Sequence, residues 1–247
     1  MRVGGNLRQR LRAGTSAMDW YPKRRFGDLA DEIADRLPDA EGLVFEEARY
    51  TFRQVAQRIN DAAKRLIAAG VGLGDHVALW LNNCDAWIFV AFAVHKIGAV
   101  LVPINTRFRA REMAYVLRQS DARFLIIEER SGSIDYLAMV RDAVSLPKTG
   151  NEVHDAAFPE LRQVILLDAQ AQAGTVAWPA LEKTAAAVSD STLATRAGIV
   201  DPDAPTFHHV HLGYHRVSQG GGAQPQTDPQ RRGAHLPDGD HAQQRDP

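Results

Sequence analysis

Apolar residues recur along this chain at two spacings, and the spacing changes from one segment to the next. In residues 55–66 they lie three or four positions apart, which predicts a helix with one buried face. Residues 77–81 form an uninterrupted apolar run, which is typical of a strand covered on both sides in a parallel sheet. The apolar positions of the helical segment are Val55, Ile59, Ala62 and Leu66.

The two patterns alternate over residues 26–188. The predicted strands are 43–45, 49–51, 77–81, 99–102, 123–128 and 163–167, of which the first two form a hairpin. The predicted helices are 26–37, 51–70, 85–97, 109–120, 134–144 and 178–188, the first with an apolar stripe of Leu29, Ile33 and Leu37. Strands that alternate with helices at βαβ spacing predict an α/β fold with a doubly wound parallel sheet.

Local signals mark where these helices begin and end. Thr51 followed by Gln54 has the spacing of a capping box, and Gly70 is the expected stop of that helix. Asp85 is expected to cap the helix that Gly98 ends. The sequence Gly70-Val71-Gly72-Leu73-Gly74 precedes a strand, whereas a nucleotide-binding loop follows one, so we interpret it as a turn.

Composition narrows the class of protein. The chain has 247 residues, 45% of them hydrophobic and 24% charged, with a net charge of −1 that gives no argument for nucleic acid or membrane binding. Its longest apolar run, 87–94, is shorter than the ~20 residues that span a bilayer. The single Cys84 excludes an internal disulfide and suits a reducing cytoplasm, where we expect the protein.

The chain divides into three predicted regions. Residues 1–25 are arginine-rich, lack an apolar stretch and are expected to be a disordered leader, with either Met1 or Met18 as the true start. Residues 26–207 carry the α/β pattern. Residues 208–247 contain six of the nine histidines and no Ile, Lys, Met, Glu, Phe or Trp, and this abrupt change predicts a disordered tail.

No residue of the α/β region identifies itself as catalytic, and no metal site is predicted. His76, His95 and His154 lack a Ser, Cys or carboxylate at triad spacing and are interpreted as structural or surface residues. His208, His209 and His211 have the spacing of metal ligands, but no predicted helix or strand holds them. Adventitious metal binding is therefore the preferred interpretation of this tail.

An ordered series of short segments resembles the acyl-CoA synthetases of the adenylate-forming superfamily. The match covers roughly residues 26–207 and is dense across 50–127. It rests on residues 70–78, Asn82-Asn83, 93–100, 102–107, 110–117 and 120–122. The resemblance implies an ATP-dependent ligase in which a carboxylate, such as a fatty acid, attacks the α-phosphate of Mg·ATP. Coenzyme A then displaces AMP from the acyl-adenylate.

The resemblance also implies a role for two arginines. Arg107 and Arg109 follow the strand-ending Pro103, where such enzymes present basic residues toward the coenzyme A nucleotide. Solvated arginines at a helix start are the alternative. In this family a segment like 201–207 leads into a phosphate loop of the form Tyr-Thr-Ser-Gly-Thr-Thr-Gly-x-Pro-Lys-Gly, whose backbone amides and lysine hold the ATP phosphates.

The codons of the tail accommodate that loop in another reading frame. Read one nucleotide later, the codons from His208 can encode Ile-Met-Tyr-Thr-Ser-Gly-Thr-Thr-Gly and then Phe-Pro-Lys-Gly without a gap. Our hypothesis is a single-nucleotide insertion after Phe207, which makes 208–247 an out-of-frame tail and the chain inactive in adenylation. Apolar faces left open by the missing part are expected to promote self-association.

Two alternatives remain open. In one, the chain is a stand-alone binding or regulatory module whose His-rich tail binds a metal. In the other, the shift is a sequencing error and the cell makes the whole ligase, which needs ATP, magnesium and coenzyme A.

Overall fold

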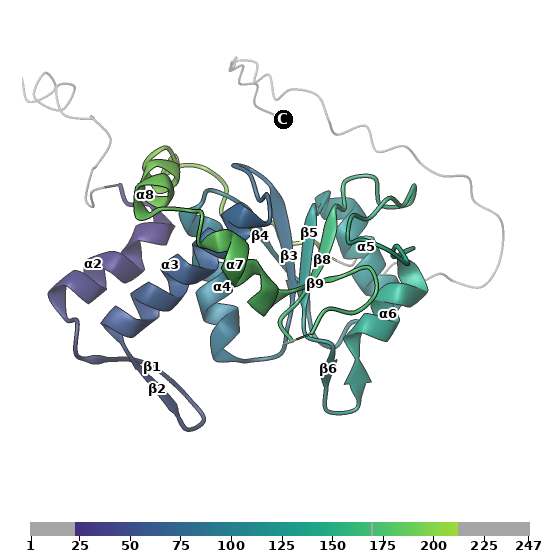
Figure 1. Cartoon of the computed structure of the whole chain (residues 1–247), viewed down its shortest axis with the longest axis horizontal. Coiled ribbons are helices and arrows are strands. Elements are labelled where there is room, and N and C mark those ends of the chain that lie inside the picture. Colours follow the sequence, from purple (N-terminus) through teal and green to yellow (C-terminus); the bar gives the residue numbers. More distant parts are fainter. Residues whose placement is uncertain (1–22, 169, 212–247) are drawn as a thin grey trace, which may run out of the picture. The chain divides into compact units, whose positions relative to one another are not determined.

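The computed structural model describes residues 23–168 and 170–211, all within one unit that ends at Leu212 (Figure 1). Its helical elements are η1 (Phe26–Asp28), α2 (Leu29–Arg36), α3 (Phe52–Ala68), α4 (Asp85–Lys96), α5 (Ala110–Ser120), α6 (Tyr136–Ala143), η2 (Trp178–Ala180), α7 (Leu181–Ala185) and α8 (Asp190–Gly198). Its strands are β1 (Glu41–Phe45), β2 (Ala48–Thr51), β3 (His76–Trp80), β4 (Val100–Pro103), β5 (Phe124–Ile127), β6 (Arg130–Ser131), β7 (Ile134–Asp135), β8 (Gln163–Leu166) and β9 (Val176–Ala177).

Five of these strands form one parallel sheet in the order β4-β3-β5-β8-β9. The chain runs from β3 outward to β4, returns across β3 to β5, and then continues outward to β8 and β9. Helices cover both faces of the sheet (Figure 1). The predicted α/β class with a doubly wound parallel sheet is thereby confirmed.

The side chains of β3 show why its sequence is apolar throughout. Val77 and Leu79 belong to the core cluster shared with α3 and α4. Ala78 and Trp80 belong to the cluster on the other face, shared with α5 and α6. All four side chains are fully buried, as expected of a central strand in a parallel sheet. The predicted apolar face of α3 is buried as well, which confirms the helical spacing at residues 55–66.

One helix start agrees with the sequence prediction and another does not. Thr51 and Gln54 form the expected capping box at α3, with bonds of 3.3 Å and 2.9 Å. At α4 the N-cap is Cys84, and the expectation that Asp85 fills this position is wrong. Asp85 is the first helical residue, where its carboxylate accepts hydrogen bonds from the Tyr50 hydroxyl and from the backbone N–H of Ala86.

The apolar stripe predicted for the first helix is only partly buried. Ile33 and Leu37 are 36% and 54% exposed, whereas the buried residue of α2 is the small Ala30. Periodicity correctly indicated a helix but could not show that its contact with α3 runs through alanine. Elements with little apolar signal went unpredicted: the short strands β6, β7 and β9, and helix α8, which buries only Leu193 and Ala197.

The chain continues alongside β4 at the end of the described region. The N–H of Leu101 donates to the carbonyl of Thr206, and the N–H of His208 donates to the carbonyl of Leu101, both at 2.9 Å. Leu101 and Phe207 thus form a parallel bridge. We call residues 206–211 the edge segment. Residues 212–247 lie outside the described residues, as do 1–22, so the disorder expected of the tail and the leader stays a prediction.

The edge segment alternates in burial like a strand. Its half-buried residues are Thr206, His208 and Val210, and its exposed residues are Phe207, His209 and His211. Val210 packs against the α5–α6 core cluster, whereas the ring of Phe207 lies against residues of α4 and η1. The strand-like course therefore extends four residues past the predicted boundary at Phe207.

Element η1 is packed tightly onto the last turn of α4. A Cβ atom added to Gly27 would lie 2.3 Å from Cα of Lys96, so only glycine fits without a backbone shift. The Lys96 side chain is 5% exposed and forms an ion pair with Asp31 of α2. This contact fixes the start of the described chain against the end of α4.

We predict that Gly27→Ala destabilises the fold by about 1–3 kcal/mol, because the added methyl group overlaps the α4 backbone. Gly198→Ala is the matched control, since Gly198 ends α8 at negative φ with no atom within 4 Å of the added Cβ. Its effect is expected to be neutral or slightly stabilising. Urea unfolding followed by circular dichroism measures both. Equal stability of Gly27→Ala and the native chain would contradict the packing described.

Candidate functional site

The sheet topology indicates where a ligand would bind. In open α/β sheets, ligands bind beyond the carboxyl ends of the strands, at the point where the strand order reverses. Here the chain leaves β3 for β4 on one side and comes back to β5 on the other. The reversal therefore lies between the loops that follow Trp80 and Ile127.

A polar cluster occupies this reversal point. The backbone N–H of Asn82 donates to Oε1 of Glu128 at 3.0 Å, which links the loop after β3 to the loop after β5. The hydroxyl of Tyr136, at the start of α6, donates to Oδ1 of Asn82 at 3.4 Å. Burial raises the pKa of Tyr136, and the negative charge of Glu128 raises it further. The cluster is thus held by both flanking loops and by α6.

The loop after β4 carries the two arginines assigned to coenzyme A. Nε1 of Trp80 donates to the carbonyl of Asn105 at 3.1 Å, and the N–H of Arg107 donates to Oδ1 of Asn105 at 2.9 Å. Arg109 Nη1 bonds the carbonyls of Arg107 and Phe108 at 3.2 Å and 3.1 Å. Both arginines are exposed at the carboxyl end of β4, the same edge of the sheet as the polar cluster.

The two arginines differ in the contacts that their side chains make. Arg109 folds back on its own loop, and its charge opposes the rise in the pKa of Tyr136 that burial and Glu128 cause. Arg107 makes its hydrogen bonds through the backbone, to Asn105 and Arg109, and no carboxylate in the described residues pairs with its side chain. Guanidinium groups match phosphate geometry, so Arg107 is the better placed of the two to contact an anionic nucleotide.

The polar cluster consists of binding groups, and one thiol lies near it: Cys84, in the loop after β3, has its pKa raised by burial and by the charge of Glu128. The groups at this edge are amides, a phenol, a carboxylate and two guanidiniums, which can orient and neutralise a polar ligand. Among residues 23–168 and 170–211, no three metal-ligating side chains converge. The magnesium and triphosphate implied by the family resemblance have no set of ligands among the described residues of the cluster.

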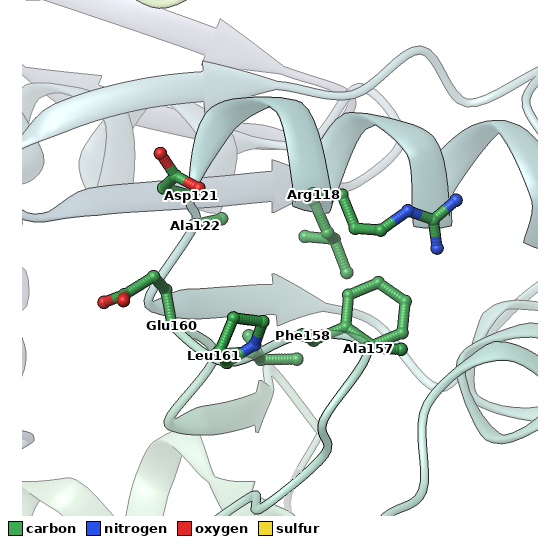
Figure 2. A pocket seen from close by; sticks show the side chains of 9 residues that line it. Arg118, Asp121, Ala122, Ala157, Phe158, Glu160 and Leu161 are labelled. Carbon is green, nitrogen blue, oxygen red and sulfur yellow. The ribbon is translucent and has the colours of Figure 1, made fainter.

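One pocket lies at the opposite edge of the sheet. It has a volume of about 230 Å³ and is lined by the end of α5 and by residues 157–161 (Figure 2). The guanidinium of Arg118 lies over the ring of Phe158, 5.3 Å from its centroid. Ala122 and Leu161 of its lining precede β5 and β8, which puts the pocket at the amino ends of the strands, the edge opposite the polar cluster.

The protein is a doubly wound α/β domain with a polar cluster at the carboxyl ends of its strands. Comparison with known proteins identifies its family. Residues 30–207 match the family model described as AMP-binding enzyme. The chain belongs to this family of adenylate-forming enzymes, and the acyl-CoA synthetases are its homologues within it.

Curated relatives agree with this assignment. YngI of Bacillus subtilis, which bears an acyl-CoA synthetase name, is 35% identical over 182 residues, or 72% of this chain and 33% of that protein. The crotonobetaine/carnitine–CoA ligase of Proteus mirabilis is 34% identical over 130 residues, or 51% of this chain and 25% of that protein. The chain therefore spans between a quarter and a third of the length of these relatives.

Solved structures show the same fold. The anthranilate–CoA ligase AuaEII, solved with anthranoyl-AMP, gives a TM-score of 0.56 at 22% identity over 67% of this chain and 29% of that one. The fatty acyl-CoA synthetase of Mycobacterium tuberculosis gives 0.51 at 24% identity over 76% and 33%.

Sequence reasoning identified only part of this edge. It singled out Arg107 and Arg109, and it noted Asn82 only as part of the family pattern. Glu128 and Tyr136 were missed, because the first is an ordinary strand-ending acid and the second an aromatic residue at a helix start. The available signal was position: Asn82 and Glu128 each follow the end of a buried strand.

We predict that Glu128→Gln lowers the pKa of Tyr136, because the substitution removes a negative charge that disfavours the phenolate. Carbon NMR of ring-labelled tyrosine measures the titration, with Tyr136→Phe to assign the signal. Glu129→Gln is the matched control, since Glu129 is the adjacent acid but bonds Gln172. An unchanged Tyr136 titration in Glu128→Gln would contradict the geometry of the cluster.

Proposed function

We propose that this chain is the leading part of an ATP-dependent acyl-CoA ligase. The whole enzyme converts a carboxylic acid, ATP and coenzyme A to acyl-CoA, AMP and pyrophosphate through an acyl-adenylate, with magnesium on the triphosphate. Membership of the AMP-binding enzyme family supports this proposal, as do relatives named as CoA ligases. Medium-chain acyl substrates occur in the names of four relatives, among them the human medium-chain acyl-CoA ligase, which is 29% identical.

The observation that carries the proposal is a coincidence at Phe207. The family match runs to this residue, and the possible codons of the residues that follow can encode a phosphate loop when the frame shifts immediately after it. We propose that the residues after Phe207 are out of frame, and that the chain as given does not adenylate. Residues 208–247 contain no lysine and no Ser-Gly-Thr-Thr-Gly run. This segment therefore lacks the positive charge and the glycine-rich backbone amides that bind and orient a triphosphate.

The alternative of a metal-binding module has less support. Two described histidines of the edge segment contact other rings: His208 lies 5.2 Å from His76, and His209 stacks on Phe207 at 5.9 Å. Within the described part of the chain these contacts gather no third metal-ligating side chain. The module would bind zinc or nickel saturably and lose that binding when residues 208–247 are deleted.

Two further proposals follow from the same assignment. We place the protein in the cytoplasm; among the described residues, no helix has both the length and the apolar composition needed to cross a bilayer.

We also propose that the chain self-associates through exposed apolar side chains. Large side chains that support this proposal are Leu37, Leu73 and Ile199, which are 54%, 55% and 60% exposed.

The frame hypothesis predicts a gain of activity from a one-nucleotide change. The gene that encodes this chain is compared with a version in which one nucleotide is deleted immediately after the Phe207 codon. Pyrophosphate release with ATP, magnesium, coenzyme A and a panel of fatty and aromatic acids is measured on both products. We expect turnover from the restored product alone, with that activity abolished when the lysine of its phosphate loop is replaced by alanine.

Two outcomes would overturn this prediction. Turnover by the chain as given would show that it does not need the loop. A nucleotide sequence that does not encode the loop in the shifted frame would remove the hypothesis itself. Mass measurement of the native protein tests the sequencing-error alternative, because the chain as given is 27.2 kDa and a whole ligase is far larger.

We also propose that Arg107 contacts the coenzyme A nucleotide. In the restored ligase, Arg107→Ala is expected to raise the KM for coenzyme A about tenfold, with kcat for adenylate formation unchanged, because one charge-assisted phosphate contact is worth roughly 1.5 kcal/mol. Arg111→Ala is the matched control, an exposed arginine two residues into α5. A KM equal to that of the native ligase would refute the assignment, and Arg109→Ala tests the second residue in the same assay.

A further inference from the structure

His95 is a buried histidine that no part of the proposed chemistry uses. It lies in the last turn of α4, is 3% exposed, and neither ring nitrogen has a hydrogen-bond partner among the residues that the structure describes. Buried polar atoms are nearly always paired, so an imidazole with both nitrogens unpaired needs an explanation. The histidine was interpreted from sequence as structural, and its surroundings give it a more specific role.

The ring of His95 is held between aromatic rings from the two ends of the described chain. The ring of Phe26, in η1, lies 4.7 Å away edge-on, and the ring of Phe207, in the edge segment, lies 4.6 Å away. Phe26 and Phe207 also meet each other, with centroids 6.2 Å apart. Phe207 is the residue at which the edge segment bridges to Leu101, so the contact with His95 fixes the side chain at the middle of that bridge.

This environment tolerates a neutral imidazole and penalises a charged one. Burial lowers the pKa of His95 from 6.5 to about 4. Phe26 and Phe207 offer ring edges and faces but no carboxylate or carbonyl that could accept a hydrogen bond from a protonated ring. A charge here without a partner costs far more than a charge in water.

The charged groups on the surrounding elements are engaged elsewhere. Lys96 of α4 pairs with Asp31 of α2, Asp28 of η1 pairs with Arg25, and β4 contributes only Val100–Pro103, without a charge. His76, His208 and His209 also lie in the edge region, so each is replaced by Gln as a control. Their rings contact each other or Phe207: His208 lies against His76, and His209 stacks on Phe207.

We propose that His95 is a positioning residue that, while neutral, holds the edge segment on β4, and that its protonation releases this segment. The edge segment leads to the point at which the proposed function puts the phosphate loop, so the inference rests on that function for its purpose. We call this contact between His95 and the edge segment the latch. Its release can be measured on this chain without any ligase activity, so the test of the latch does not depend on the proposed function.

Release of the segment exposes His95 and returns its pKa toward 6.5. A group that is neutral in the closed state and basic in the open state makes opening more favourable as the pH falls through 6.5 toward 4. With these two pKa values, the opening equilibrium rises about 20-fold between pH 7 and pH 5. Above pH 7 the opening equilibrium no longer changes.

Amide hydrogen exchange by NMR tests the latch, because two amides report on it directly. Leu101 donates to Thr206 and His208 donates to Leu101, so both lose their partner when the segment leaves. After correction for intrinsic exchange rates, we expect their protection to fall about 20-fold from pH 7 to pH 5, while the amides of β5 keep theirs. His95→Phe and His95→Gln should remove this pH dependence, since neither side chain titrates.

Matched variants separate His95 from its neighbours. His154→Gln removes an exposed histidine and His209→Gln removes the ring stacked on Phe207, and both should keep the pH dependence. The proposal is overturned if Leu101 and His208 stay protected at pH 5, if their loss persists in both His95 variants, or if it disappears in His209→Gln. It is also overturned if β5 loses protection to the same extent, because the event would then be global unfolding. Should His95→Phe fail to fold, His95→Gln decides.

The restored ligase gives a separate readout. There, the acid limb of the pyrophosphate-release profile should move to lower pH in His95→Gln. An inactive restored ligase would defeat the proposed function and leave the exchange result on the latch standing.

Discussion

The edge of the sheet depends on the hydrogen bonds that the backbone of Leu101 makes to the edge segment. This residue is fully buried in β4, where β3 lies on one side, and its own N–H and carbonyl point to the other. Thr206 and His208 supply the partners at 2.9 Å each. Without them, a buried donor and a buried acceptor would each cost about 1–3 kcal/mol. Because these bonds involve backbone atoms alone, they form whatever side chain follows Phe207, and this explains why the strand-like course runs past the change in composition.

Pairing at this edge joins segments that are far apart in the sequence. Phe207 is placed by the bridge to Leu101, its ring packs on His95 of α4, and both meet Phe26 of η1. Element η1 is in turn locked on α4 because Gly27 leaves no room for a side chain beside Lys96. Three parts of the chain therefore pack together: the sheet edge, the last turn of α4 and the beginning of the described chain. A change in the packing of any one of them is expected to alter the packing of the edge segment.

Features that depend on residues close together in the sequence could be predicted from the sequence, whereas features that depend on contacts between distant residues could not. The apolar run of β3 and the spacing of α3 report burial directly, so the sheet and its main helices could be predicted. The exposure of Ile33 and Leu37 could not, because a pattern shows which side chains are apolar but not whether a partner covers them. The bond from Asn82 to Glu128 was also beyond reach, since it exists only because β3 and β5 pair in register across 46 residues.

Backbone pairing brings the end of the described chain beside β4. At Leu101 the edge segment runs parallel to β4, and His208 then lies against His76, the first residue of β3. The polar cluster of Asn82, Glu128 and Tyr136 follows the carboxyl ends of β3 and β5, where α/β domains bind ligands. This cluster can orient a ligand but holds no set of triphosphate ligands, so the proposed function requires the phosphate loop to supply them. The latch proposed at His95 would then set how firmly the segment that precedes this loop is held.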